Sequence, residues 1–301
     1  MIVPTILRIA TLLLFTGRAW QHLFWDAPLR TLLWDQQWME GIILFLRGGT
    51  WQEYVTSAQA DHAIQMISLG FGIFYSLMAV FTLFVSEKQK GVTWLYIIAS
   101  LALTFLAFLY CKEKFFQLGQ FFEYTIQFLL PVVFIYVVNG KIQRSRIELF
   151  LKIAIALTFS SHGLYAIGVY PRPGAFIDMV INILHTSEAG AIRFLNIAGV
   201  LDFLVSIAIF IPRISRAALI YAVIWGGLTA LARVWANFYW SFPLESLHQH
   251  LYETIYRLPH MLVPLAVLYL SFPGLSIFRI VRSRRSALDE HTIEVANQMN
   301  E

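Results

Sequence analysis

The chain has 301 residues, of which 58% are hydrophobic, 16% aromatic and 13% charged. A soluble domain carries charge on about a quarter of its residues, so this chain has about half of the charge that a water-facing surface needs. Intrinsic disorder is excluded as well, because 25 Phe, 13 Tyr and 9 Trp cannot all stay solvated. The net charge of +4 is spread over short connections, which does not indicate a nucleic-acid partner. We therefore expect an integral membrane protein whose main partner is the lipid bilayer.

Eight stretches are apolar and long enough to cross a bilayer, which takes about 20 residues. They are 5–25, 63–85, 92–110, 120–138, 149–170, 190–211, 217–236 and 256–272. Two further segments, 28–46 and 173–185, are amphipathic and begin at a proline, and we expect them to lie at the outer surface of the membrane. The sequence thus predicts an all-α polytopic fold of about eight transmembrane helices with short outer interfacial helices.

The basic residues of the connections indicate how the chain is oriented. Lysine and arginine follow the second, fourth, sixth and eighth stretches, whereas the first and the last of the intervening connections are acidic. The connection 111–119 fits this alternation least, because Lys112 and Lys114 outnumber Glu113. The pattern predicts a protein of the plasma (inner) membrane with both termini in the cytoplasm.

The spans repeat as four plus four, which predicts two related halves. Residues 7–10 (LRIA) match 151–154 (LKIA), and Pro131 matches Pro264 in the last span of each half. In the same register Arg18 falls opposite His162. A second match, Ala63-Ile64-Gln65 with Ala191-Ile192-Arg193, places Phe74 opposite Asp202.

The repeat defines the expected domains. Residues 1–140 form the first four-helix unit and 149–273 the second, with a basic cytoplasmic linker at 141–148 and a cytoplasmic tail at 274–301. Units with an even number of spans are parallel repeats, which are related by an axis along the membrane normal.

Ionisable side chains inside the membrane need a partner or a task, since one at the bilayer centre costs roughly 2.5–3.5 kcal/mol. Asp202 is the deepest acid, and Arg233 on the next span is placed to reach down toward it. The two residues form either a structural ion pair between helices or, with His162, a substrate or proton site, because a histidine pKa can be tuned across neutral pH. Glu123 falls in the first outer turn of its span and is not expected to be informative.

The remaining polar side chains of the spans fall in their outer halves, which predicts a polar pocket that opens outward. The expected catalytic residues are His162 and Asp202. The expected ligand-binding residues are Arg233, Tyr165, Asn237, His260, Arg18 and His22. For each histidine, a hydrogen-bonded packing role is the alternative.

One cluster has the composition of a metal site: His248 and His250 with Glu245 and Glu253. Side chains two residues apart diverge on a helix, and this segment reads as helical or irregular. The spacing therefore favours a wetted outer connection, and we assign no metal site.

The second half resembles the DoxX-like membrane proteins, four-helix units that include a subunit of a thiosulfate:quinone oxidoreductase. The resemblance is carried by 159–164 (FSSHGL), where that family often has a Phe followed by His-Gly, and by 199–204 (GVLDFL), where it often has an acid in a small and apolar run. It covers 150–272 and reaches the first half only through the repeat. Because Arg18 and Phe74 replace His162 and Asp202 there, we expect the first half to be a scaffold.

The residues and the resemblance together predict a pocket that binds a small or amphipathic molecule. The resemblance adds a redox-linked role with a quinone as the candidate cofactor. In this interpretation His162 donates or accepts a proton, Asp202 sets its charge state and Arg233 holds an anionic or carbonyl group. A small-solute transporter and a non-catalytic subunit of a membrane complex are the alternatives, and whether the chain is an enzyme stays open.

Overall fold

The computed structural model describes residues 2–86, 90–140 and 143–274, and this part of the chain is helical, without strands. Seven segments within it are long and apolar enough to cross a membrane. They are α1 (Ile2–Phe24), α5 (Ala58–Phe84), α6 (Thr93–Glu113), the pair α7 (Leu118–Glu123) and α8 (Thr125–Val138), α9 (Arg144–Ile167), α11 (Glu188–Ala208) and α12 (Ser215–Ala236). The protein is therefore a polytopic helical membrane protein.

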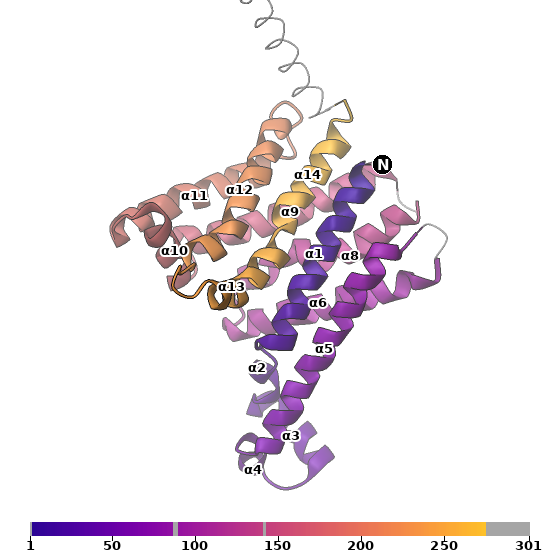
Figure 1. The fold of residues 1–301 in the computed structure, drawn as a ribbon, viewed down its shortest axis with the longest axis vertical. Coiled ribbons are helices and arrows are strands. Elements are labelled where there is room, and N and C mark those ends of the chain that lie inside the picture. The colour runs from indigo at the N-terminus through magenta and orange to yellow at the C-terminus, as the bar shows by residue number, and fades with distance from the viewer. Residues whose placement is uncertain (1, 87–89, 141–142, 275–301) are drawn as a thin grey trace, which may run out of the picture.

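The predicted last span, 256–272, is divided into parts of two helices. The amphipathic helix α13 (Pro243–Arg257) ends just before Leu258, and α14 (Pro259–Ser271) begins at a proline, whose missing N–H is tolerated at the first helical position. With 13 residues, α14 is shorter than the seven long apolar segments, but it packs inside the bundle against α1, α9 and α12. Its last turn reaches the end of the bundle where α1 begins (Figure 1).

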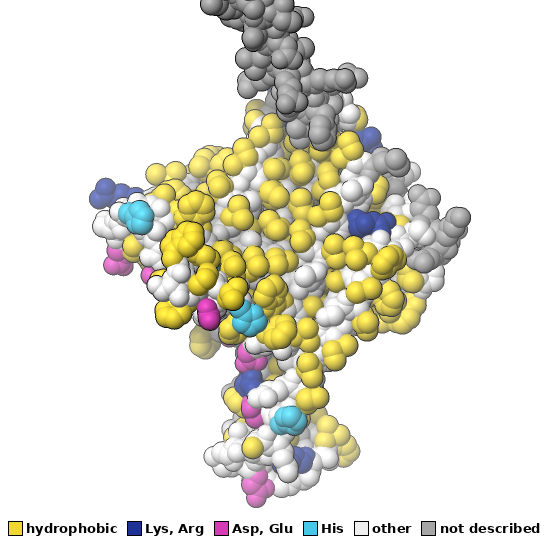
Figure 2. All heavy atoms as spheres, viewed as in Figure 1, with side chains coloured by type: hydrophobic (Ala, Val, Ile, Leu, Met, Phe, Trp, Pro, Cys, Tyr) yellow, Lys and Arg dark blue, Asp and Glu magenta, His cyan; other side chains and the backbone are white. Residues whose placement is uncertain are grey.

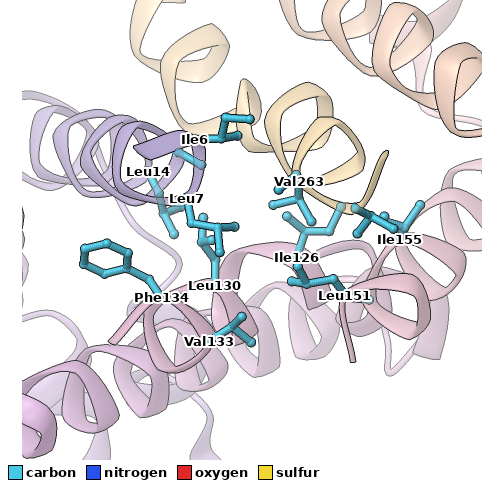
Figure 3. Packing of buried hydrophobic residues seen from close by; sticks show 14 of the residues in the cluster. Ile6, Leu7, Leu14, Ile126, Leu130, Val133, Phe134, Leu151, Ile155 and Val263 are labelled. Carbon is cyan, nitrogen blue, oxygen red and sulfur yellow. The ribbon is translucent and has the colours of Figure 1, made fainter. Parts of the chain in front are cut away.

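The core of the bundle is formed where α1, α8, α9 and α14 meet. Their facing side chains are aliphatic or aromatic, and Figure 3 shows Leu7 and Leu14 of α1, Leu130 of α8, Ile155 of α9 and Val263 of α14 converging on this centre. Around it, α5 packs on α1, α11 on α9, α6 on α8 and α12 on α14. The four inner helices thus hold the bundle together, and each carries one outer helix.

A lobe formed by α2 (Arg30–Leu33), α3 (Gln36–Arg47), α4 (Trp51–Val55) and the start of α5 extends beyond the lower end of the bundle (Figure 1). The predicted surface segment 28–46 belongs to this lobe. Asp35 caps α3 by accepting a hydrogen bond from the Trp38 N–H, and its carboxylate also pairs with Lys112 of α6. This ammonium group holds the pKa of the Asp35 carboxyl below its usual value. The second surface segment, 173–185, contains α10 (Gly174–Leu184), which packs on α11 and α12.

The surface of the bundle suits a lipid environment. Over the helices the visible face is mostly hydrophobic, while acidic side chains appear toward its lower edge and on the lobe (Figure 2). Large apolar side chains such as Leu101, Ile197 and Ile207 are exposed on the outer helices. The tail beyond residue 274, part of the 141–148 linker and Lys88 lie outside the described residues, so the orientation drawn from their charges stays a prediction.

Candidate ligand-binding site

A cavity of about 460 Å³ lies between α9, α10, α11 and α12, with the start of α14 beside it. Its volume is in the usual range for ligand pockets. Most of its wall is aromatic or aliphatic, including Phe159, Phe176, Phe194, Leu195 and Trp225. Space is left because the residues at several wall positions are small, among them Ala166 and Ala198.

The mouth of the cavity is on the side of the bundle. Three of its wall residues on α12, Leu228, Leu231 and Trp235, are 54%, 53% and 73% exposed. All three are apolar and belong to an outer helix, on the surface that suits lipid. The opening is therefore lateral, which differs from the outward direction expected from the sequence.

One end of the cavity is lined by four polar side chains: His162, Arg233, Arg257 and His260. With Glu123 and Glu253 they form what we call the polar cluster. Arg257 Nη1 lies 3.1 Å from Glu123 Oε1, and His162 Nδ1 lies 3.9 Å from the same oxygen. Arg233 Nη1 lies 3.4 Å from Glu253 Oε2, and the rings of His162 and His260 are 5.8 Å apart.

The polar cluster keeps unused hydrogen-bonding capacity. Arg233 Nε, Arg257 Nε and His260 Nε2 are buried and have no hydrogen-bond partner. His260 Nδ1 lies 2.7 Å from the Arg257 carbonyl oxygen, which can only accept, so Nδ1 carries the proton. In the neutral imidazole, Nε2 is then an acceptor. Since buried polar groups are rarely left without partners, this combination of donors and an acceptor indicates a ligand site.

Asp202 lies elsewhere along the same cavity. Its side chain is buried, Trp225 is its hydrogen-bond neighbour, and its Oδ1 has no partner. The first of the two alternatives, an ion pair of Asp202 with Arg233, is wrong, because Arg233 contacts Glu253 of α13 instead. Trp225 and Arg233 are eight residues apart on α12, which corresponds to about 12 Å along the helix axis. Asp202 and Arg233 are therefore associated with two different levels of α12.

Four of the eight predicted site residues do not line the cavity. The Tyr165 hydroxyl donates to Gln117 Oε1 at 2.9 Å, and Asn237 Nδ2 donates to the Arg233 carbonyl oxygen at 2.8 Å. Both contacts join parts of the helical framework. Arg18 and His22 are the other two, and they lie in the first half of the chain.

Arg18 is completely buried but has no carboxylate beside it among the described residues. Its guanidinium donates through Nη1 to Gln21 Oε1 at 2.6 Å and through Nε to Gln127 Oε1 at 3.1 Å. Its Cζ also lies 3.9 Å from the centre of the Tyr256 ring, a cation–π contact. Arg18 thus connects α1 to α8 and α13, while His22 Nδ1 is bonded to the Arg18 carbonyl oxygen.

Glu123, Glu253 and Arg257 belong to the polar cluster but were not among the predicted site residues. From the sequence we expect Glu123, in the first turn of its span, to be uninformative, yet it is buried and Gln120 Nε2 donates to it at 3.1 Å. A signal was present in the sequence: Glu123 is the one acid in the apolar stretch 120–138. An acid in such a stretch needs a cation, and Arg257 comes from a distant part of the chain.

Among the residues that the structure describes, no group of three His, Cys, Asp or Glu side chains is placed to hold a metal ion. His248 lies instead among aromatic rings, with Trp20 Nε1 donating to its Nδ1 at 3.2 Å. Comparison of the chain with protein-family models, curated proteins and solved structures finds no match.

Proposed function

We propose that this membrane protein binds a small amphipathic molecule in the cavity between α9 and α12. The observation that carries the proposal is an apolar cavity of about 460 Å³ that contains buried polar atoms without partners. An apolar wall with a few convergent polar groups is the usual composition of a small-molecule site. The lateral mouth suits a molecule that dissolves first in the bilayer.

We also propose that the two halves are repeats, as the sequence predicts. The buried positions of the inner helices support this. Leu7, Ala10 and Phe15 of α1 correspond to Leu151, Ala154 and Phe159 of α9, and all of them are buried. In the last helices, the buried residues Ile126, Gln127, Leu130 and Pro131 correspond to Pro259, His260, Val263 and Pro264.

The buried positions of α5 and α11 favour a register that differs by one residue from the sequence match. Gly72 and Gly199 correspond, because a Cβ on either one would meet a side chain near the end of the first helix of its half, Leu23 or Ile167. In this register Tyr75, and not Phe74, is the counterpart of Asp202. Tyr75 is fully buried.

The counterpart of the cavity in the first half is nearly filled. A space of about 10 Å³ lies there, lined in part by His22, Phe71 and Tyr75. Their counterparts in the second half are the smaller residues Ala166, Ala198 and Asp202, which line the large cavity. This difference supports the proposal that the first half is a scaffold and that the second half keeps the site.

The two halves supply matched variants for a test. Ala198→Phe puts into the cavity the side chain that the first half carries at Phe71, while Ile197→Phe adds the same ring to the lipid-facing side of α11, where Ile197 is 63% exposed. We expect a neutral amphiphile, decyl-benzoquinone, to bind saturably to the wild type and to Ile197→Phe in lipid nanodiscs, measured by native mass spectrometry. Binding to Ala198→Phe should fall at least tenfold. Equal binding to all three proteins would overturn the proposal.

A quinone is compatible with the site on chemical grounds. Its carbonyl oxygens would accept hydrogen bonds from the guanidinium groups of Arg233 and Arg257, and a quinol hydroxyl could donate to His260 Nε2. Bound quinone would supply redox chemistry, in line with the DoxX resemblance. A proteoliposome flux assay distinguishes binding from transport, because sustained movement of a solute across the membrane contradicts a binding role.

The orientation in the membrane is part of the same proposal: an inner-membrane protein with both termini in the cytoplasm. The start of α1 and the end of α14 lie at the same end of the bundle (Figure 1), which supports termini on one side. Reporter fusions after residues 140 and 301 should report the cytoplasm, and a reporter in the lobe near residue 49 should report the outside. The reverse pattern would overturn the orientation.

A further inference from the structure

From the unpaired atoms of Arg233 and Asp202, we infer the class of the ligand: a single-chain carboxylic acid that carries a hydrogen-bond donor toward the far end of its chain. The carboxylate binds Arg233 in place of Glu253, and the donor reaches Asp202. This inference rests on the proposed function and narrows it.

The two arginines of the polar cluster differ in how firmly they are paired. Arg257 and Glu123 are 3.1 Å apart, and their side chains are 12% and 7% exposed. Glu123 is further held by His162 and Gln120. The charge of Arg257 is therefore balanced by a close carboxylate inside the protein, although its Nε keeps an unused donor.

Arg233 is held much more loosely. Its distance of 3.4 Å to Glu253 is longer than a normal hydrogen bond between nitrogen and oxygen. The Glu253 side chain is 26% exposed, so it is already partly hydrated and can turn toward solvent. Arg233 Nε has no partner, and the guanidinium lies 5.9 Å from the centre of the Phe176 ring in the cavity wall. Arg233 is thus the cation that is free to change partners.

A carboxylate is the group that fits this exchange. Its two oxygens match the planar fork of a guanidinium, which has unused donors here. The polar cluster has two arginines and two glutamates, and replacing the Glu253 charge by one ligand carboxylate keeps this balance. A phosphate would bring additional negative charge. Arg257 would not balance this charge, because it is already paired with Glu123.

The far end of the ligand is specified by Asp202. The cavity wall is mostly apolar, which suits a hydrocarbon chain, and Arg233 is about 12 Å along the axis of α12 from Trp225, the neighbour of Asp202. A methyl end would leave Asp202 Oδ1 without a partner in an apolar surrounding, which is unfavourable. A hydroxyl at this end would donate to Oδ1 and remove that cost.

Three commercial probes of equal chain length test both ends: ω-hydroxydodecanoate, dodecanoate and dodecanol, titrated into the protein in lipid nanodiscs at neutral pH. We expect ω-hydroxydodecanoate to bind about tenfold more tightly than dodecanoate, as one buried hydrogen bond allows. Dodecanol should bind most weakly. In Asp202→Leu the two acids should bind equally, and in Arg233→Met dodecanoate should lose its advantage over dodecanol.

Glu253→Gln provides a gain of binding that a misfolded protein cannot produce. It removes the competing carboxylate from Arg233, so dodecanoate should bind several-fold more tightly than to the wild type. Glu245→Gln, an exposed position on the same helix, is the matched control and should leave affinity unchanged.

Two outcomes separate this inference from the proposed function. If decyl-benzoquinone binds in the cavity but dodecanol binds as well as dodecanoate, or the hydroxyl gives no gain, the inference is overturned and the proposed function stands. If neither the quinone nor any of the three probes binds, both fail.

Discussion

Glu123 and Arg257, which are 134 positions apart in the chain, form an ion pair that joins α7 to the last residue of α13. Both side chains are almost fully buried, so neither charge can be compensated by water. Glu123→Gln leaves the Arg257 charge without its carboxylate, and we expect the free energy of unfolding to fall by about 3–5 kcal/mol. Reversible unfolding in lipid or mild detergent, followed by tryptophan fluorescence, measures this loss.

The double variant Glu123→Gln with Arg257→Met is the control for this prediction. It removes both charges, so it should be more stable than Glu123→Gln alone. If the loss of stability in the double variant equals the sum of the losses in Glu123→Gln and Arg257→Met, the two side chains do not stabilise each other.

Gly17 is required by the close approach of α1 to α13. A Cβ at this position would lie 2.6 Å from the Tyr256 backbone nitrogen and 2.8 Å from the Tyr252 carbonyl oxygen, and neither backbone atom can move aside cheaply. We expect Gly17→Ala to lower the free energy of unfolding by about 1–3 kcal/mol. Gly70→Ala is the control, because nothing lies within 4 Å of its Cβ position. Similar losses in both variants would refute the close-packing argument.

The contact between the lobe and the bundle should depend on pH through Asp35. Lys112 holds the pKa of this carboxyl below its ordinary value of 3.8. A carboxyl with a lowered pKa stabilises the folded state at pH values above its ordinary pKa. This stabilisation is lost as the pH falls through the lowered pKa. Hydrogen exchange of α3 should therefore become faster only in strong acid.

Lys112→Met tests the cause of that pH dependence. It removes the ammonium group, so α3 should exchange faster at neutral pH, and the additional acceleration in acid should become small. Unchanged exchange in the variant would show that the Asp35–Lys112 contact does not hold the lobe.

The spans were predictable from the sequence because apolar length alone decides whether a helix can cross a bilayer. Seven of the eight predicted stretches correspond to long apolar helical segments. The eighth differs because Pro259 starts a new helix where hydropathy shows only a continuous apolar run. The sequence leaves the segment of α13 open as helical or irregular, and its Glu253 is the carboxylate that contacts Arg233 in place of Asp202.

The cavity could be predicted only in part. His162, Asp202, Arg233 and His260 were expected at one site because polar side chains inside spans are rare, and all four line the cavity. The pairing of Glu123 with Arg257 could not be predicted, because the two residues come from different halves of the chain. Short apolar motifs also leave the register open by a residue, which is why Phe74 was matched to Asp202 although Tyr75 has the corresponding burial.

Because the lateral mouth lies beside Leu228, Leu231 and Trp235, the affinity of the site is best expressed relative to the amount of ligand in the bilayer. A molecule that reaches the site from the membrane competes there with lipid chains, and its availability follows its mole fraction in the bilayer. Diluting the same amount of ligand into more lipid should therefore weaken apparent binding even when the aqueous volume is constant. Occupancy in the cell would then report the composition of the surrounding membrane.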